Sequence, residues 1–476
     1  MAMPSLMLSR SCRSCSRFSS FFHTNNRYAS SVVSVNTSEE IPGEEIQYPP
    51  IKPRWPPGSW GNMTEKRSWS IWEQSNKLKD TKLKLKDRFE MLSPSPEVTW
   101  KCPSVQHYPR SFEYQQYVTK THMAPGMPEV YEQMEEEAMA YLQRIKPLIE
   151  RVILFENFLI DRNIKYTRYN KLDPDNVTFL QTEKIINCLL SVLAPDFPHL
   201  LTSQFAENVR VRAFWDRYGI PTKPYILRKD REFQRFEKMY SRFNTEFICS
   251  QIRSEKPLMP FVPRDSPLCT ESEYSQFCYW PSDLSQQNEK VKNICIPGFF
   301  HGDPCEFGLV SFHCSSQMKR KIKQFGPEIT YEFQKGLGLI TSFAWTVAQA
   351  YFLGFSSFVE LTYPLTTQTV ITDGQKFSFF AYQLNTLEMW KDDDGNNLKN
   401  ICWHTEEENL YELKDGQIQN FNDNVLKQLI KFFMNQPKEP NYPLRPYLED
   451  DPSKIERYLE DKQKKVSRRN QRKVTN

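Results

Sequence analysis

The chain has little glycine: 15 glycines stand against 33 prolines in 476 residues. Average proteins contain roughly 7% glycine and 5% proline, so glycine is at about half of its usual share and proline is above its own. A phosphate-binding loop needs several closely spaced glycines, and the closest pair, Gly336 and Gly338, lacks the rest of that motif. The G-x-S-x-G and H-E-x-x-H motifs are also absent. The sequence therefore contains no motif of a phosphate loop, a serine hydrolase or a zinc peptidase.

Acidic residues are missing from the first 38 positions. This stretch carries four arginines among many serines, and it has no continuous apolar run of the kind that a secretory signal requires. An arginine-rich, serine-rich and acid-free N-terminus is typical of mitochondrial presequences. We therefore expect residues 1–28 to be a mitochondrial presequence, with cleavage in the region of Arg27 to Ser30. A disordered basic tail is the alternative.

The net charge predicts no general affinity for nucleic acid. The chain has 62 basic and 58 acidic residues, and removal of the presequence with its four arginines leaves 58 of each. A neutral protein must bind nucleic acid through local patches. Two basic segments suit this role, although charge runs are usually only solvated. The residues expected to contact RNA are Lys77, Lys79, Lys82, Lys84, Lys86, Arg88, Lys462, Lys464, Lys465, Arg468, Arg469, Arg472 and Lys473.

The 11 cysteines form no disulfide pattern. One C-x-x-C pair lies within the predicted presequence, and the other cysteines are scattered singly, as in a reduced matrix protein. The densest group of soft metal ligands is His301, Cys305, His313 and Cys314, but its spacing fits no ordinary zinc motif. Neighbours such as His313 and Cys314 also point to opposite sides of a strand. We therefore expect buried thiols and imidazoles here and no cofactor, with a zinc site as the alternative.

Composition divides the chain into four regions. After the presequence, residues 29–127 form a predicted extended arm that is rich in proline and aromatic residues and includes a basic helix. Residues 128–436 are predicted to be one α+β globular core with mixed helices and strands. Residues 437–476 form a proline-rich and then basic tail. No run approaches the 18 or more apolar residues of a membrane-spanning helix, and Phe343 to Phe355 is predicted to be a core helix.

Local patterns predict several elements of the core. Pro128 to Arg162 is expected to be helical, with Pro147 breaking or restarting the helix. Apolar residues alternate with polar ones at 209, 211, 213 and 215, which predicts a strand. Ile329 to Phe355 is expected to be a long helix. Phe421 to Asn435 is expected to be an amphipathic helix that begins at Asn422 or Asp423 and ends before Pro437.

The stretch VITDGQKFSFFAYQLN, residues 370–385, predicts a β-hairpin. Asp373 and Gly374 form its turn, because glycine tolerates the positive φ that tight hairpin turns need. Apolar side chains point to both faces of the return strand, so this strand should be central in its sheet. The residues expected to form the structural core are Phe377, Phe379, Phe380 and Tyr382.

The same stretch permits a catalytic interpretation. Nucleases of the restriction-endonuclease type place an acid at a strand end, followed by an acid or glutamine, one spacer and a lysine, to hold a metal ion and activate water. Asp373 and Gln383 fit this pattern, but Asn385 occupies the lysine position, and an amide cannot supply that charge. We therefore expect no enzyme activity. The alternative is a matrix protein with a degenerate fold of that type, which retains nucleic-acid binding or an unrecognised activity.

Four motifs in the last third of the chain carry a family resemblance: SFAWTVAQAYFLGF, VITDGQKFSFFAYQLNTL, KNICW and FNDNVLKQLIKFFMNQPKE. In order and spacing they resemble the mitochondrial ribosomal protein family called programmed cell death protein nine, first filed under the small subunit and now placed in the large one. The resemblance implies a non-catalytic component of the large mitoribosomal subunit in the matrix. It also implies contact with mitochondrial rRNA, with other mitoribosomal proteins and with a paralogous large-subunit protein as heterodimer partner.

Overall fold

The computed structural model describes most of the chain between residues 97 and 446. The described ranges are 97–103, 108, 110–161, 174–221, 236–244, 249–275, 281–284, 286–291, 294–300, 302–315, 326–356, 360–389, 396–414 and 416–446. The predicted presequence and both basic segments lie outside these ranges. All described residues fall within one of the chain's two compact units, Ile51–Asn476.

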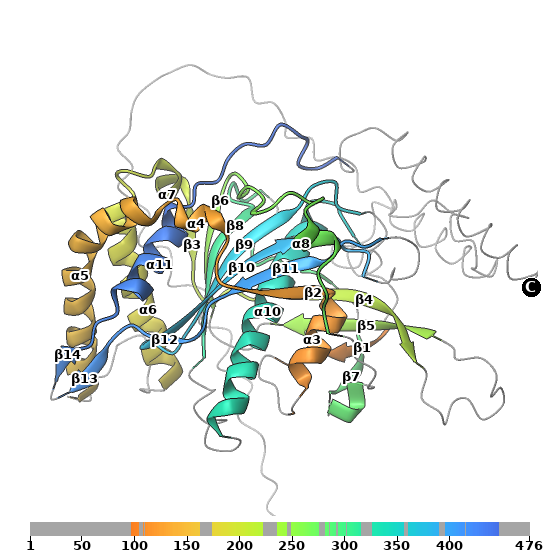
Figure 1. Cartoon of the computed structure of the whole chain (residues 1–476), viewed down its shortest axis with the longest axis horizontal. Helices are drawn as coiled ribbons and strands as arrows, with labels where there is room; N and C mark the ends of the chain where they lie inside the picture. Colours follow the sequence, from red (N-terminus) through yellow and green to blue (C-terminus); the bar gives the residue numbers. More distant parts are fainter. Residues whose placement is uncertain are drawn as a thin grey trace, which may run out of the picture. The chain divides into compact units, whose positions relative to one another are not determined.

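A mixed sheet of eight strands forms the centre of the described part (Figure 1). Its strand order is β2-β11-β10-β9-β8-β6-β3, and β12 pairs with β10 beside this path. The pairs β2/β11 and β8/β9 are parallel, and the other pairs are antiparallel. The strands are β2 (Thr121–Pro125), β3 (Gln204–Ala206), β6 (Cys249–Ser254), β8 (Phe307–Cys314), β9 (Leu365–Thr372), β10 (Lys376–Leu384), β11 (Asn400–His404) and β12 (Glu408–Asn409).

A second sheet of four strands has the order β4-β5-β1-β7, and β13 pairs with β14 separately. These strands are β1 (Glu97–Lys101), β4 (Arg212–Pro221), β5 (Phe236–Asn244), β7 (Asn288–Val291), β13 (Glu412–Lys414) and β14 (Gln417–Gln419). The helices are α3 (Ser111–Thr119), α4 (Glu129–Glu132), α5 (Glu135–Asp161), α6 (Pro174–Leu193), α7 (Pro198–Thr202), α8 (Pro267–Thr270), α10 (Pro327–Phe352) and α11 (Asp423–Met434), with a short 3-10 helix η1 (Pro281–Leu284). The predicted α+β class is confirmed.

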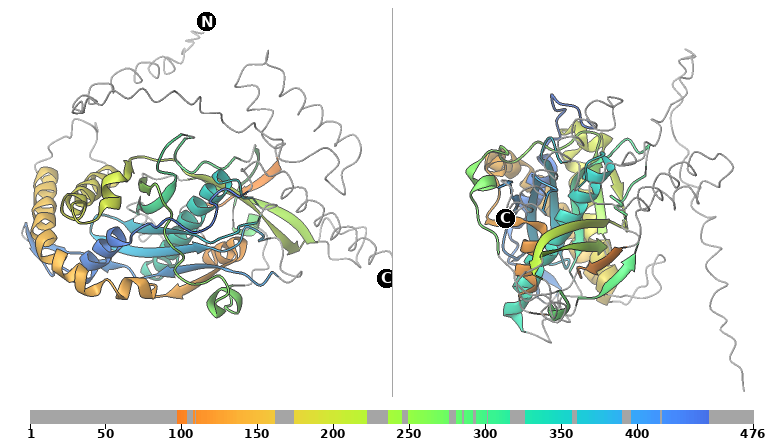
Figure 2. Two further views of the ribbon diagram at one scale, coloured as in Figure 1. Left: turned by 90° about the horizontal axis from the view of Figure 1, so that it is seen from above. Right: turned by 90° about the vertical axis from the view of Figure 1, so that its right-hand side faces the viewer.

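Helices cover both faces of the large sheet. On one face α5, α6 and α11 enclose a core that includes Ile149, Ile186 and Leu429. On the other face α10 and α3 enclose a second core, and β4 packs on α10 through Trp215, whose ring centre lies 4.8 Å from that of Phe343. In Figure 2 the orange and yellow helices α5 and α6 stand at one end and the yellow-green strands of the small sheet at the other. The layers are therefore three helices, the large sheet, α10 with α3, and the small sheet.

The predicted hairpin is the centre of the large sheet, where β10 lies between β9 and β11. Gly374 has a φ of 91°, and Asp373 Oδ1 accepts hydrogen bonds from the backbone N–H groups of Gln375 (3.0 Å) and Lys376 (2.8 Å). The strand is buried on both faces. Phe377 and Phe379 belong to the core under α5, α6 and α11, and Phe380 and Tyr382 belong to the core under α10.

α10 lies very close to the large sheet because it has a glycine at the contact. A Cβ atom on Gly338 would lie 2.2 Å from Cζ of Phe380. The helix spans Pro327–Phe352, near the predicted range, and every residue from Gly336 to Ala350 is buried. The glycine at position 338 therefore serves helix–sheet packing.

Two expectations about helices and boundaries differ from the structure. Pro147 does not break α5, which continues from Glu135 to Asp161. Pro147 is exposed, so the carbonyl group that loses its partner can bind water, and Figure 1 shows α5 bent, as proline causes. Residues 97–125, which composition assigned to the extended arm, contribute β1, α3 and β2 to the folded unit. β2 pairs with β11 far along the chain, and local composition carries no information about such a partner.

The start of α11 agrees with its prediction. The side chain of Asn422 accepts a hydrogen bond from the backbone N–H of Asn424 at 3.0 Å, which caps the helix before Asp423.

Candidate functional site

The residues of the nuclease hypothesis do not converge. Asp373 lies in the turn before β10, whereas Gln383 lies near the opposite end of that strand. Asp373 lies beside Lys376 at the start of β10, and a strand rises about 3.3 Å per residue, so the length of β10 separates the two side chains by roughly 20–25 Å. Ligands of one metal ion must lie within about 2–2.6 Å of it. Asp373 and Gln383 therefore form no common metal site.

Gln383 and Asn385 have a structural role. The buried Gln383 accepts hydrogen bonds from the backbone N–H groups of Phe261 (2.9 Å) and Val262 (3.1 Å), and its amide donates to Asn385 Oδ1 (2.9 Å). Asn385 donates in turn to the carbonyl oxygen of Lys399 at 2.8 Å. An amide side chain can donate and accept hydrogen bonds at the same time, and these two residues use both capacities to hold a loop against the end of β10.

The described members of the predicted soft-ligand group are also spread out. Cys305 precedes β8, whereas His313 and Cys314 lie at its end. The strand therefore separates Cys305 from the other two residues by roughly 20 Å or more. His301 lies outside the described residues. Burial lowers the pKa of His313 to about 3, so this imidazole is neutral at physiological pH. Across the described ranges, no group of three or more His, Cys, Asp or Glu residues could hold a metal ion.

The expected RNA contacts lie in the two basic segments, Lys77 to Arg88 and Lys462 to Lys473, which are outside the described part of the chain. Among the helices that the structure describes, none is long and apolar enough to cross a membrane.

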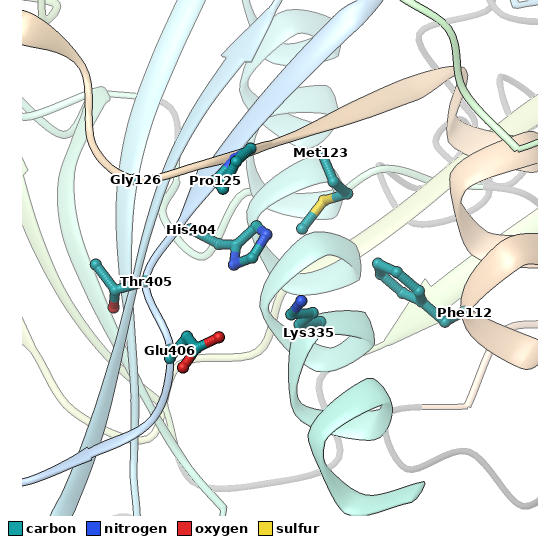
Figure 3. Close-up of a pocket in the computed structure, with 8 residues that line it drawn as sticks. All are labelled: Phe112, Met123, Pro125, Gly126, Lys335, His404, Thr405 and Glu406. Atoms are coloured by element: carbon teal, nitrogen blue, oxygen red, sulfur yellow. The ribbon is translucent and has the colours of Figure 1, made fainter. Parts of the chain in front are cut away.

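A pocket of about 530 Å³ opens at one edge of the large sheet, on the side of α10 (Figure 3). It lies where the parallel strands β2 and β11 end, and α3 and α10 each add a side chain. Ligands commonly bind outside the carboxyl ends of parallel strands in open α/β sheets. The lining residues are Phe112, Met123, Pro125, Gly126, Lys335, His404, Thr405 and Glu406.

His404 is the most deeply buried titratable group of this pocket. Its side chain is 7% exposed, and its Nδ1 atom is buried with no hydrogen-bond partner in the described structure. Burial lowers the pKa of His404, and the nearby charge of Lys335 lowers it further, so the imidazole is neutral at pH 7. An unsatisfied buried polar atom costs about 1–3 kcal/mol. The buried Nδ1 atom is therefore a local cost to the stability of the fold.

Lys335 and Glu406 add opposite charges to the pocket. Burial lowers the pKa of Lys335, and the carboxylates of Glu406 and Glu332 oppose this effect. The pocket thus combines a cation, an anion and a neutral imidazole with the apolar side chains of Phe112 and Met123.

Sequence reasoning missed this pocket because its residues come from four separate segments. One local signal was present. Lys335 is the only charged residue between Phe333 and Ala350, in a helix that is otherwise uncharged there.

Comparison with known proteins identifies the family. A model of the family described as mitochondrial 28S ribosomal protein S30 (PDCD9) matches residues 13–437. The large ribosomal subunit protein mL37 of Gallus gallus is 25% identical to this chain over 308 residues, which cover 62% of each protein. The match thus spans less than two thirds of the chicken protein. The resemblance of the four sequence motifs is confirmed, and with it the expected location in the mitochondrial matrix. The chain belongs to the PDCD9 family of mitochondrial ribosomal proteins.

Proposed function

We propose that this chain is a non-catalytic structural component of the large subunit of the mitochondrial ribosome. The observation that carries the proposal is the family match over residues 13–437. The family description names a 28S protein, whereas the chicken relative is named as a large-subunit protein. The ordered sequence motifs and the chicken relative together favour the large subunit.

The folded core supports a scaffold role. The polar groups that suggested a nuclease are occupied within the fold: Gln383 and Asn385 hold a loop, and Asp373 closes a turn. The potential zinc ligands Cys305 and Cys314 are buried at opposite ends of β8. A scaffold needs a rigid core and segments that contact its partners, and the sequence of this chain adds two basic segments to the described core.

Contact with rRNA is proposed for the basic segments. A neutral protein gains nothing from its overall charge, so the affinity must come from Lys77 to Arg88, with six basic residues, and Lys462 to Lys473, with seven. Each neutralised phosphate releases counterions, which gives a log–log salt slope of about −0.9 per contact on duplex and about −0.7 on single strands.

A paralogous large-subunit protein is the proposed partner, on the basis of the family resemblance. An apolar stripe on α5 supports a protein contact of this kind: Leu154, Phe155 and Phe158 are 40%, 54% and 50% exposed. Large exposed apolar side chains that are grouped on one surface often mark protein interfaces.

Sedimentation of a mitochondrial extract tests the proposed function. The tagged full-length chain should migrate with the large subunit through a sucrose gradient in high salt, because a structural component is held by many contacts. Migration with the small subunit would contradict the subunit assignment. Release to the top of the gradient would contradict a structural role.

Charge reversal tests the RNA contacts. Replacing the six basic residues of Lys77 to Arg88 by glutamate should weaken association with the large subunit and flatten its salt dependence. The control reverses Glu136 and Glu137 to lysine, because both are exposed on α5. Neighbouring Glu135 is unsuitable as a control because it pairs with Lys427 and Lys431. Unchanged salt-dependent retention after neutralisation of both basic segments would mean that the folded core binds the RNA.

A further inference from the structure

The pocket at the edge of the large sheet has the size and the chemistry of a ligand site. Its volume of about 530 Å³ lies within the range of roughly 300–1,000 Å³ that small-ligand sites occupy. Figure 3 shows Met123, His404, Lys335 and Phe112 gathered around one space, with Glu406 at its lower side. Gly126 has a φ of 87°, and no atom lies within 4 Å of where its Cβ would be, so the backbone there borders open space.

The walls of the pocket suit a flat aromatic group. The Phe112 ring and the His404 imidazole are planar, and the thioether of Met123 makes favourable contacts with aromatic rings. Phe112 and Met123 are partly buried against the core under α10, and this packing fixes their positions. Aromatic side chains bind unpaired nucleobases by stacking.

The polar groups suit a neutral ligand with both donors and acceptors. Lys335 would repel a simple cation, and Glu406 would repel a simple anion such as free phosphate. A neutral heterocycle avoids both penalties and can use both groups, because an ammonium only donates hydrogen bonds and a carboxylate only accepts them.

Guanine matches this set of groups best among the RNA bases. Its N1–H and N2–H₂ groups are adjacent donors that one carboxylate can accept together, and its O6 and N7 atoms are acceptors for lysine. Adenine lacks that pair of adjacent donors. We propose that this pocket binds an unstacked guanine base of RNA, held by Glu406 and Lys335 between the side chains of Phe112, Met123 and His404. The choice of RNA as the source of the base rests on the proposed function.

Binding to the purified full-length chain tests the inference. The protein is labelled with [methyl-13C]methionine, and the Met123 signal is assigned from Met123→Leu. Titration with GMP should shift this signal through the ring current of the base. AMP, CMP and UMP should bind at least about 10-fold more weakly, because one bidentate base contact discriminates between bases by about 5- to 150-fold. Equal shifts with all four nucleotides, or none with GMP, would overturn the proposal.

Short RNAs distinguish the source of the base. A single-stranded adenine pentamer with one central guanine should compete with GMP for the pocket, and the all-adenine pentamer should compete at least about 10-fold less well. Binding of GMP without competition by the guanine-containing RNA would indicate a free-nucleotide site and overturn the assignment to RNA.

Substitutions at two glutamates, Glu406 and Glu408, test the role of Glu406. Glu406→Gln should remove most of the preference for GMP over AMP, and Glu408→Gln, an exposed change two residues along the chain and outside the pocket lining, should preserve it. Both positions are exposed, so both variants should fold. A preference that survives Glu406→Gln would overturn the assignment of Glu406. If the chain does not bind guanine but sediments with the large subunit, only this inference is contradicted. If the chain binds guanine-containing RNA but dissociates from the large subunit in high salt, only the proposed function is contradicted.

Discussion

The two faces of the large sheet are covered by helices of different kinds. α10 lies between the large sheet and β4, and it is buried on all sides along its middle. On the other face α5 buries one side against α6 and α11 and leaves charged residues exposed on its other side, whereas α11 is partly exposed near its start and buried from Leu429 to Met434. The first pattern is typical of a helix inside a core, and the second is that of an amphipathic surface helix.

This difference predicts how each face responds to mutation. On the α10 face, stability depends on a close fit between a glycine and an aromatic ring, so added volume should be harmful. On the other face, stability depends on the burial of aliphatic and aromatic side chains, and ion pairs at the edge add to it. Lys427 and Glu135 pair there at 2.6 Å, and Lys146 and Asp423 pair at 2.7 Å. Surface pairs of this kind contribute only about 0–1 kcal/mol each.

Removing a large side chain from α11 should have the largest effect. Leu429 is 0% exposed in the core under α5 and α6, and Leu429→Ala should lower the free energy of unfolding by about 2–5 kcal/mol through lost burial and an added cavity. Urea denaturation measures this change. The exposed Asn424→Ala on the same helix is the control and should change stability by about 0.5 kcal/mol or less. A loss below about 1 kcal/mol for Leu429→Ala would contradict the assignment of α11 to the core.

Loss of the buried amide on the same face should come next. Gln383→Ala leaves the backbone N–H groups of Phe261 and Val262 without their acceptor, and we expect a loss of roughly 2–4 kcal/mol. Asp373→Ala, at the half-buried turn of the same strand, removes an acceptor whose partners can bind water instead and should cost only about 1 kcal/mol. Equal losses in the two variants would show that the buried network is no more important than the turn. Because both residues have structural roles, neither substitution should remove a nuclease activity. Metal-dependent cleavage of RNA or DNA by the purified protein, lost in Asp373→Ala, would contradict the structural role of Asp373.

Added volume on the α10 face should destabilise by a smaller amount. Gly338→Ala places a methyl group against the ring of Phe380, and we expect a loss of about 1–3 kcal/mol, although alanine favours the helix by up to about 1 kcal/mol. Combining Gly338→Ala with Phe380→Leu should cost less than the sum of the two single changes, because the smaller side chain relieves the contact. Additive losses in thermal or urea unfolding would show that the two residues do not limit the approach of the helix.

The ion pairs should contribute least, and their contribution should depend on pH. Hydrogen bonds from Lys427 and then Lys431 lower the pKa of Glu135 below its ordinary value of 4.5. A carboxyl whose pKa is lower in the folded state stabilises the fold above pH 4.5, and this stabilisation is lost as the pH falls through the folded-state pKa. Glu135→Gln should therefore cost less than about 1 kcal/mol at pH 7, and the difference from wild type should shrink toward pH 3. A difference that grows on acidification would show that Glu135 is not stabilised as a carboxylate.

The elements that sequence patterns predicted well are those with strong local signals. Asp373 and Gly374 predicted the hairpin turn, Asn422 predicted the start of α11, and a long apolar segment predicted the buried α10. The predictions that were wrong depended on distant contacts. Pro147 is tolerated because it faces solvent, and residues 97–125 join the folded unit because β2 pairs with β11.

The sequence by itself determined the family of this protein, its α+β class and the two-sided burial of its central hairpin. Motif order, helical and strand periodicity and turn chemistry all lie within short stretches of chain, so the printed residues are sufficient to identify them. Only the tertiary structure decided that Gln383 accepts hydrogen bonds from the backbone of Phe261 and Val262, and that Phe112, Lys335 and His404 border one pocket. The physical reason is that a site depends on distances across the fold, which strand order and helix packing set between residues hundreds of positions apart.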